Sequence, residues 1–422
     1  MKMHCEESTT AAVPIFILCC ERSGSSLLRY IIDTHPEIAS PAELNLGELC
    51  KCLYYAVEGT TGEVLNIADR TEKKSIIGDQ VNRIISDLMD SYVIAKKKRM
   101  WCEKSPSNLQ NVEFIKSVFP ESKYICLHRH AMDVVHSCME ITRFGFMPDQ
   151  LTYLCHNSGN IVGAMVENWI DKTRKLLQFE REIPERCFRI KYESYILNQT
   201  QALSPMFEFL GVTWDASLLD SVFSVKHDQG AEDHKVKFSQ RIHKNSIGKG
   251  TSIKLKYIPK HLLKEMNKLL EELEYPPVGP DWDTASSLYT PRDSGAKEDN
   301  VTLNVEEILT RYLTPRIKEL RDKLQGRKVI YKIIVTGVGG GLWTIDLTKP
   351  SNHLECGENG KADCTVTVSS KDAVDLVKGN FNPVELEIQG KLHIAGEAVL
   401  REIFCWFLVG RLQWYKSSPE WW

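Results

Sequence analysis

The sequence predicts an α/β protein with two domains, and three observations lead to this prediction. In the first 275 residues, short apolar runs are each followed by a polar turn and a helical pattern, which is typical of a parallel sheet. Between Pro276 and Asn300 the hydrophobic periodicity disappears among prolines, serines and aspartates. Beyond this stretch, alternating strands and short helices indicate a small α+β domain. The length of 422 residues also favours more than one hydrophobic core.

The first predicted domain, residues 1–275, begins with an apolar strand at Val13–Cys20. A polar turn, Arg22–Ser26, connects this strand to a helix that starts around Leu27. Further strands are predicted at Tyr124–Leu127 and Phe188–Ile190, and helices at Asn111–Val118 and Gly163–Glu180. Strands this short that are apolar throughout need helices on both sides, so we expect a P-loop-like parallel sheet with both faces covered.

Residues 276–303 form the predicted linker, residues 304–415 the second domain, and residues 416–422 a tail. In the second domain the pattern predicts one continuous amphipathic helix over Val305–Leu324. The other expected elements are strands at Lys328–Val335, Leu342–Leu347 and Cys364–Val368, and helices at Lys371–Lys378 and Glu397–Leu408. A unit of roughly 110 residues is large enough to fold alone.

Charge and hydropathy exclude several classes of protein. The chain has 53 Lys and Arg against 56 Asp and Glu, a net charge of −3, so no overall positive field would recruit nucleic acid. The longest apolar runs, Val13–Cys20 and Ile403–Val409, are shorter than the roughly 20 residues of a membrane-spanning helix. Met1–Thr10 has the pattern of neither a signal peptide nor a transit sequence. We therefore expect a cytoplasmic protein without stable membrane insertion, with its 13 cysteines reduced.

The polar turn after the first strand has the composition of a phosphate site. A turn at the start of a helix directs backbone N–H groups and the positive end of the helix dipole toward one point. Arg22 adds a positive charge, and Gly24 lets the backbone approach closely. Hydroxyl donors come from Ser23, Ser25 and Ser26.

The same turn argues against an ATP or GTP hydrolase. A Walker-A loop needs a lysine followed by a hydroxyl, but Leu27-Leu28-Arg29 occupies that place. The second strand ends in His128-Arg129, where such a hydrolase would have an aspartate for Mg²⁺. The turn is therefore predicted to bind phosphate without a metal ion.

Four blocks in order resemble the sulfotransferase family that uses 3′-phosphoadenosine 5′-phosphosulfate (PAPS). Arg22–Leu28, running into Asp33–Pro36, resembles the 5′-phosphosulfate loop of that family. Lys123–Arg129, followed by Asp133 and Ser137, resembles its 3′-phosphate site. The other matching blocks are Glu103–Asn108, and Ile190–Glu193 followed by Phe209–Gly211. The resemblance covers about residues 13–275 and implies sulfuryl transfer from PAPS, with 3′,5′-phosphoadenosine (PAP) as the product.

The resemblance also implies roles for particular residues. Those at the 5′ end of the nucleotide would be Arg22, Ser23, Gly24, Ser25, Ser26 and Leu27. Those around the rest of it would be Arg129 and Ser137 at the 3′-phosphate, Tyr192 near the adenine, and Ser246, Gly248 and Lys249 in a closing loop. Arg22 and Lys104 would stabilise the sulfuryl group and the leaving phosphate. Tyr192 is equally compatible with a core aromatic residue, and the basic stretch Arg241–Lys249 with a solvated turn.

The predicted general base departs from the small-molecule branch of the family. That branch has a histidine two residues after the lysine, where this sequence has Pro106. The tyrosylprotein branch has a glutamate after a His-Pro pair, and His35-Pro36 followed by Glu43 matches that spacing. Glu43 is therefore the predicted base. The alternative is a helix-capping carboxylate, because Pro41-Ala42-Glu43 also has the pattern of a helix start.

Glu21 and three histidines are the other charged or metal-binding residue types near the turn and the second strand. Glu21 stands where the family usually has proline, and we expect it to face outward or to pair with a cation such as Lys104 or Arg129. His128, His130 and His136 lie close in sequence, but no cysteine or carboxylate completes a zinc-binding spacing. No metal site is therefore predicted.

The second domain resembles the sterol carrier protein-2 (SCP2) family over about residues 304–412. The matching stretches are Ala362–Val368, Lys371–Lys378, Asn382-Pro383 and Ile388–Gly396. The resemblance implies an apolar tunnel for acyl chains or sterols. We favour a dimer contact or scaffold over such a tunnel, because the apolar segment Ile403–Val409 and the aromatic residues of the tail suit a protein interface as well as a lipid pocket. Those aromatic residues are Trp406, Trp414, Trp421 and Trp422.

These observations predict a sulfotransferase that acts on a hydroxyl group, an amine or a guanidine nitrogen of a small molecule such as a natural product. Two alternatives stay open: a lipid carrier with a non-catalytic nucleotide-binding domain, and a phosphotransferase. The presence of Arg22, Lys104, Arg129 and Ser137 argues against the first. The missing Walker residues and magnesium carboxylate argue against the second.

Overall fold

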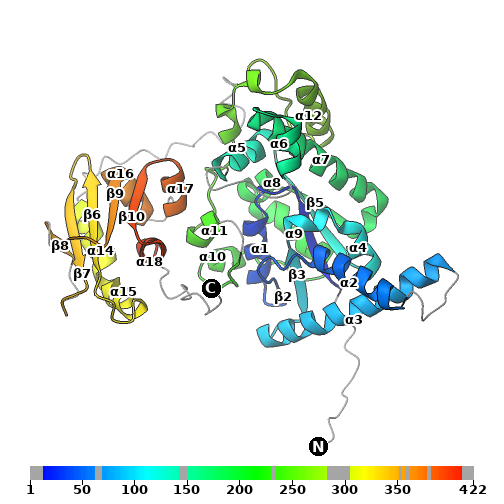
Figure 1. Ribbon diagram of the computed structural model, residues 1–422, viewed down its shortest axis with the longest axis horizontal. Helices are drawn as coiled ribbons and strands as arrows, with labels where there is room; N and C mark the ends of the chain where they lie inside the picture. Colours follow the sequence, from blue (N-terminus) through cyan, green and yellow to red (C-terminus); the bar gives the residue numbers. More distant parts are fainter. Residues whose placement is uncertain are drawn as a thin grey trace, which may run out of the picture. The chain divides into compact units, whose positions relative to one another are not determined.

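The computed structural model describes residues 13–61, 69–141, 150–230, 234–282, 305–350, 354–357, 361–377 and 382–410. Within these ranges the chain forms two compact units, coloured along the chain in Figure 1. The first unit contains the described residues up to 230 and from 244 to 282, and the second contains residues 234–243 and those from 305 onward. The predicted tail, and the predicted linker from residue 283, lie outside the described residues.

A sheet of five parallel strands forms the centre of the first unit, in the order β2-β3-β1-β4-β5. The strands are β1 (Ile15–Cys19), β2 (Ile38–Ala39), β3 (Met100–Lys104), β4 (Lys123–His128) and β5 (Cys187–Lys191). All five residues of β1 are fully buried, which explains why its sequence is apolar without alternation. The predicted parallel sheet is confirmed, and β2 and β3 are strands that the sequence pattern did not predict.

Helices cover this sheet (Figure 1). Their apolar side chains form two clusters, and both clusters include residues of the long helix α7. The helices are α1 (Ser25–Thr34), α2 (Leu46–Thr61), α3 (Arg70–Lys96), α4 (Val112–Val118), α5 (Ala131–Ile141), α6 (Leu151–His156), α7 (Ile161–Glu182), α8 (Tyr192–Leu197), α9 (Gln199–Leu210), α10 (Leu218–Ser221) and α12 (Lys260–Glu272). Short 3₁₀ turns are η1 (Pro106–Leu109), η4 (Pro184–Arg186), η5 (Lys249–Ser252) and η6 (Leu255–Tyr257). Phe16 and Leu18 of β1 pack with α2, α3, α4 and α7, whereas α5, α7 and α12 share the second cluster.

The first unit extends beyond its predicted end at Tyr275. Val278 and Trp282 are 1% and 5% exposed and belong to the cluster of α5, α7 and α12. The backbone N–H of Val278 also donates to Asn267 Oδ1 at 2.8 Å. The prediction that the linker starts at residue 276 is therefore wrong. Val278 and Trp282 are buried in the first unit, although the prolines around them are typical of a linker.

The second unit is built on a mixed five-stranded sheet in the order β10-β9-β6-β7-β8. Its strands are β6 (Ile330–Thr336), β7 (Gly341–Asp346), β8 (Glu355–Cys356), β9 (Cys364–Ser369) and β10 (Leu392–Gly396). Strand β6 runs parallel to β9 and antiparallel to β7, and every second residue of β9 is buried. The sheet therefore has one core face, and the predicted α+β domain is confirmed.

Five helices accompany this sheet. They are α14 (Val305–Leu313), α15 (Ile317–Lys323), α16 (Ser370–Val377), α17 (Pro383–Ile388) and α18 (Ala398–Leu408). The continuous helix predicted over Val305–Leu324 is wrong, because a 3₁₀ turn, η7 (Thr314–Arg316), separates α14 from α15. Pro315 lies in this turn, and proline lacks the N–H of an α-helix and disfavours the helical conformation of the preceding residue.

Residues 234–243 also pack in the second unit, although the sequence pattern placed them in the first domain. They contain helix α11 (His234–Phe238), whose Phe238 side chain is 4% exposed within the core of the second unit. Its ring centroid lies 4.7 Å from that of Trp406 on α18. Gln240 adds a hydrogen bond to the carbonyl of Val409 at 2.7 Å. The second unit therefore includes a segment that lies between two parts of the first unit in the sequence.

The cysteines of the described residues are all free thiols. Burial raises the pKa of Cys19 to about 11 and that of Cys50 to about 12, so both side chains are neutral at pH 7. Across the same part of the chain, no helix is both long enough and apolar enough to cross a bilayer.

Candidate active site

The loop between β1 and α1 carries the predicted 5′-phosphate contacts. Arg22 and Gly24 both adopt a left-handed backbone conformation, with φ of 66° and 93°, and so turn the chain sharply into the helix. A larger residue cannot replace Gly24, because its Cβ would lie 2.3 Å from the ring of Tyr192. The hydroxyl of Tyr195 donates to the Gly24 carbonyl at 2.8 Å. Two tyrosines of α8 therefore fix the shape of this loop.

Helix α1 begins at Ser25, directly after the loop. Among the described residues no side chain caps this helix start, and its first turn contains no acidic residue. Ser23, Ser25 and Ser26 are all buried in the same turn, with Leu27 behind them. Such a helix start attracts anions through its backbone N–H groups and its dipole. The turn thus has the chemistry of the predicted phosphate site.

Lys104 connects the phosphate loop to the predicted base. This residue ends β3, beside β1, and is only 1% exposed. Its Nζ donates to Ser26 Oγ at 3.3 Å and forms an ion pair with the Glu43 carboxylate. The structure therefore brings together the predicted loop, cation and base from three separate segments of the chain.

The helix-capping alternative for Glu43 does not fit its surroundings. The backbone N–H groups of Glu48 and Leu49 donate to the Asn45 carbonyl, so Asn45 and not Glu43 stands at the start of α2. The Glu43 side chain is 14% exposed and is directed to Lys104. Its role as a base stays a prediction.

Glu103 anchors the same loop from the sheet. Its carboxylate is fully buried and accepts hydrogen bonds from the Leu44 N–H at 3.0 Å, from Ser105 Oγ at 2.5 Å and from Asn108. Burial raises the pKa of Glu103, although its hydrogen-bond donors oppose the shift. Sequence reasoning gave this residue no role, although a carboxylate beside Lys104 in a matching block was a usable signal.

The predicted 3′-phosphate residues lie beside the phosphate loop. Arg22 Nε donates to Ser137 Oγ on α5 at 3.2 Å. Arg129, the first residue after β4, donates to the Arg22 carbonyl at 2.8 Å and also to the Ser246 carbonyl. Its guanidinium lies 4.3 Å from the centroid of the Tyr192 ring. Arg22, Arg129, Ser137 and Tyr192 therefore form one continuous group with the loop.

Asp133 holds the loop Ser246–Gly250, which contains the predicted residues Gly248 and Lys249. Its two carboxylate oxygens accept the N–H groups of Gly248 at 2.9 Å and Gly250 at 2.7 Å. Gly250 must be small, because a Cβ there would lie 2.4 Å from the backbone of Met132. Asp133 belongs to a matching sequence block, but its function as the anchor of a distant loop could not be recognised without the fold.

The buried extension of the first unit supports this loop too. The indole N–H of Trp282 donates to the Gly250 carbonyl at 3.2 Å, and its ring stacks on His130 with centroids 5.1 Å apart. Burial lowers the pKa of His130 to about 4, so this ring is neutral at pH 7. Two distant segments, residues 129–133 and the region of Trp282, therefore hold the nucleotide-side loop.

Glu21 does not face solvent, nor does it pair with Lys104. It is 2% exposed, and its carboxylate lies 3.9 Å from Lys172 Nζ on α7 and accepts a hydrogen bond from Asn168. The expected ion pair thus exists with a different lysine. This arrangement directs the negative charge of Glu21 away from the phosphate loop, toward α7.

The histidines near β4 are engaged in other contacts. His128 pairs with Glu180 at 2.7 Å, and His130 packs under Trp282. Within the ranges that the structure describes, no group of three or more His, Cys, Asp or Glu side chains could hold a metal ion.

The site residues meet where β1, β3 and β4 end. Lys104 ends β3, Arg129 follows β4, and the phosphate loop follows β1, which lies between those two strands. From β1 the chain continues to β2 and β3 on one side and later to β4 and β5 on the other. Parallel sheets bind ligands at such switch points, at the carboxyl ends of the strands.

In comparison with known proteins, two parts of the chain match family models. Residues 14–216 match the model of the sulfotransferase family, and residues 305–401 match that of the SCP-2 sterol transfer family. Over 209 residues the chain is 24% identical to protein-tyrosine sulfotransferase A of Caenorhabditis elegans, covering 49% of this chain and 51% of that protein. Over 90 residues it is 34% identical to sterol carrier protein 2 of Gallus gallus, covering 19% of this chain and 16% of that protein.

Among solved structures, the sulfotransferase domain from the curacin biosynthetic pathway is similar, with a TM-score of 0.45 and 23% identity. That match covers 63% of this chain and 98% of the other. The chain spans about half the length of the curated sulfotransferases of Caenorhabditis elegans and Gallus gallus that it matches. Both resemblances expected from the sequence blocks are confirmed by the family matches.

Proposed function

Because residues 14–216 form a sulfotransferase-family domain and residues 305–401 an SCP2 domain, we propose that this chain is a PAPS-dependent sulfotransferase. The acceptor is a hydroxyl group, or an amine or guanidine nitrogen, of a small molecule. Glu43 serves as the general base, and Arg22 and Lys104 stabilise charge in the transition state.

The observation that carries this proposal is the position of Lys104. Its ammonium group contacts the phosphate loop at Ser26 and pairs with Glu43. In-line transfer places the leaving group and the nucleophile on opposite sides of the transferred group. A cation beside the phosphate loop can stabilise the leaving phosphate, and a carboxylate next to that cation is placed to serve the nucleophile.

The residues present fit PAPS, whose bound form would supply an activated sulfuryl group. The narrow turn at Gly24 and the uncapped start of α1 would hold the 5′ end. Arg129 and Ser137 would hold the 3′-phosphate, and Tyr192 would lie near the adenine. Lys104 would offset the negative charge that develops at the 5′ end.

Glu43 would remove the proton of the acceptor as the nucleophile attacks. Its carboxylate pairs with Lys104, so it lies beside the cation that contacts the phosphate loop at Ser26. The position of Glu43 depends on the backbone of its loop. Glu103 anchors this backbone by accepting a hydrogen bond from the N–H of Leu44.

Ligand-induced stabilisation tests the nucleotide site. PAP at about 100 times its dissociation constant, without Mg²⁺, should raise the free energy of unfolding by about 2.7 kcal/mol. AMP, which lacks the 3′-phosphate, should give a smaller increase, and Ser137→Ala should bring the effect of PAP close to that of AMP. Stabilisation by ATP with Mg²⁺ but not by PAP would instead support a phosphotransferase.

We propose further that the second domain binds an apolar molecule. The indole N–H groups of Trp343 and Trp406 are buried but have no hydrogen-bond partner among the described residues. Buried polar groups normally have a partner, so these N–H groups are candidate donors to the polar head of an otherwise apolar ligand. The fusion with this domain also favours an acceptor of lipid-like character.

Tryptophan fluorescence tests this second proposal. Palmitate added to the full chain should change the emission, and Trp406→Phe should remove most of that change. Phe238, which packs on Trp406, offers a control, because Phe238→Leu should leave the titration midpoint within about threefold. The absence of any binding below the critical micelle concentration would favour the alternative of a protein contact.

A further inference from the structure

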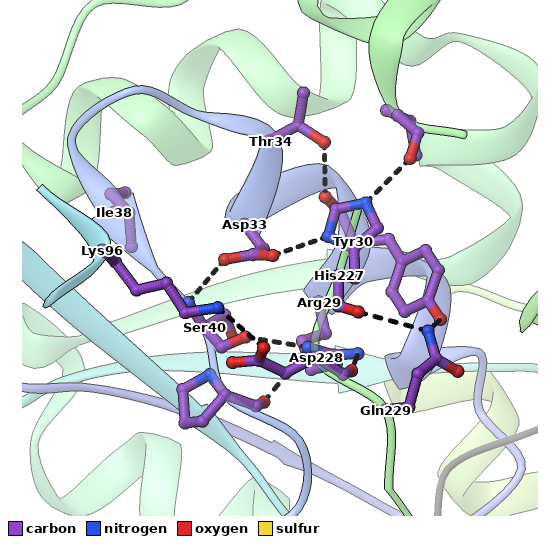
Figure 2. A network of polar contacts seen from close by, with 12 residues as sticks. Arg29, Tyr30, Asp33, Thr34, Ile38, Ser40, Lys96, His227, Asp228 and Gln229 are labelled. Atoms are coloured by element: carbon purple, nitrogen blue, oxygen red, sulfur yellow. Dashed lines mark hydrogen bonds and ion pairs between the residues drawn. The ribbon is translucent and has the colours of Figure 1, made fainter. Parts of the chain in front are cut away.

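The loop that carries Glu43 is held through its backbone by Arg29 of α1, and Figure 2 shows Arg29 with Ser40 of this loop and with Asp228. Arg29 is fully buried, and its Nη1 donates to the carbonyls of Ser40 at 2.8 Å and Pro41 at 3.2 Å. Its Nη2 donates to the carbonyl of Asp228 at 2.9 Å, on a segment 199 residues further along the chain. One guanidinium therefore joins α1, the base-bearing loop and a distant segment.

A second contact between α1 and this loop lies one helical turn further on (Figure 2). Asp33 accepts the backbone N–H of Ser40 at 2.8 Å and pairs with the ring of His227 at 2.6 Å. Burial alone would raise the pKa of Asp33, but His227 and Lys98 outweigh it and lower that pKa below its ordinary value. The carboxylate therefore remains a charged, and hence strong, acceptor for the Ser40 N–H.

Helix α3 braces the distant segment from the other side (Figure 2). The Asp228 carboxylate accepts a hydrogen bond from Lys96 Nζ at 2.7 Å and one from the Tyr92 hydroxyl at 2.8 Å. Two residues later, Gly230 packs so closely that a Cβ there would lie 2.6 Å from the Cβ of Ala42. The segment thus touches the residue next to the predicted base.

We infer that Arg29 is a positioning residue for sulfuryl transfer, because it sets the place of Glu43 through the loop backbone, with segment 227–230 as its brace. The inference rests on the proposed function of Glu43. Arg29 fixes the carbonyls that precede Glu43, and Glu103 fixes the N–H of Leu44 that follows it. The position of the Glu43 carboxylate therefore depends on both anchors, Arg29 before it and Glu103 after it.

Kinetics and hydrogen exchange together test this inference. Arg29→Lys retains the charge but cannot bridge both carbonyls. Since a displacement of the order of 1 Å can cost up to about 10²-fold in rate, we expect turnover to fall by about tenfold or more, while PAP affinity changes less than about twofold. In a Glu43→Gln background, Arg29→Lys should cause no further loss of turnover, because the substitution acts by displacing Glu43. The backbone amides of Ser40 and Leu44 should exchange faster in Arg29→Lys.

Two other variants complete the test. Asp228→Asn weakens only the contacts of segment 227–230 with α3, so it should cause a smaller loss of turnover than Arg29→Lys. This loss should also be absent in the Glu43→Gln background. The variant keeps the inference testable if Arg29→Lys folds poorly. Arg316→Lys is the matched control, since Arg316 donates to the Phe407 carbonyl at 3.0 Å within the second unit and should leave turnover unchanged.

The inference would be overturned if Arg29→Lys lowered turnover by the same factor in the wild-type and Glu43→Gln backgrounds. It would also be overturned if Arg29→Lys left hydrogen exchange at the Ser40 and Leu44 amides unchanged. A chain that transfers no sulfuryl group would refute the proposed function instead. Hydrogen exchange does not depend on sulfuryl transfer, so unchanged exchange in Arg29→Lys would refute the anchoring of the loop by Arg29 even then. The failure of the inference and the failure of the proposed function can therefore be told apart.

Discussion

Replacing Lys104 with methionine is expected to lower turnover by about 10² to 10³-fold. The substitution keeps the volume of the buried side chain but removes the charge that contacts Ser26 and pairs with Glu43. An interaction that strengthens as charge develops is lost mainly from the transition state, so turnover should fall more than PAP affinity. Single-turnover kinetics at saturating PAPS, with the dissociation constant of PAP from calorimetry, measure both quantities.

Lys123→Met is the matched control for this variant. Lys123 begins β4, so it lies at the opposite end of the strands from the site, and its Nζ donates to the Phe209 carbonyl at 2.6 Å. The control should cost some stability and leave turnover within about threefold. If Lys104→Met had no larger effect on turnover than this control, the catalytic role of Lys104 would be excluded.

Glu43→Gln is expected to reduce turnover by about 10²-fold or more, with little change in PAP affinity. Glutamine has the same shape as glutamate but cannot take up the proton of the acceptor, and it cannot form the ion pair with Lys104. Steady-state rates of the two proteins at saturating PAPS, with the dissociation constant of PAP from calorimetry, measure the effect.

Glu48→Gln provides the comparison for the base. Glu48 is an exposed carboxylate at the start of α2 that pairs with Lys51 at 3.1 Å, so losing its charge should not affect turnover. Equal rates for Glu43→Gln and Glu48→Gln would show that the acceptor is deprotonated without Glu43.

The order of strand, turn and helix at the phosphate loop could be predicted from the sequence, because each step there has a local signal. Strand β1 is apolar throughout, and Gly24 marks a turn that only glycine allows. The resemblance of several blocks also identified Lys104 and Glu43 as separate candidates. Their contact could not be derived locally, because it depends on β3 pairing with β1.

Other features could not be predicted from the sequence, because they depend on contacts between distant segments. Asp133 has no local pattern that distinguishes a loop anchor from an ordinary helical carboxylate, yet it holds Gly248 and Gly250. Strand β3 ends in the charged pair Glu103-Lys104, which conceals a buried strand from any hydrophobic pattern. Helix α11 is short and basic, and its place in the second unit is shown by contacts such as that of Phe238 with Trp406, which no local pattern reveals.

A crystal structure of the chain with PAP tests the two-anion arrangement most directly. The account predicts the 5′-phosphate within hydrogen-bond distance of the loop Arg22–Ser26 and of Lys104, and the 3′-phosphate on Arg129 and Ser137. PAP bound elsewhere on the first unit, or bound with neither phosphate on these residues, would contradict it.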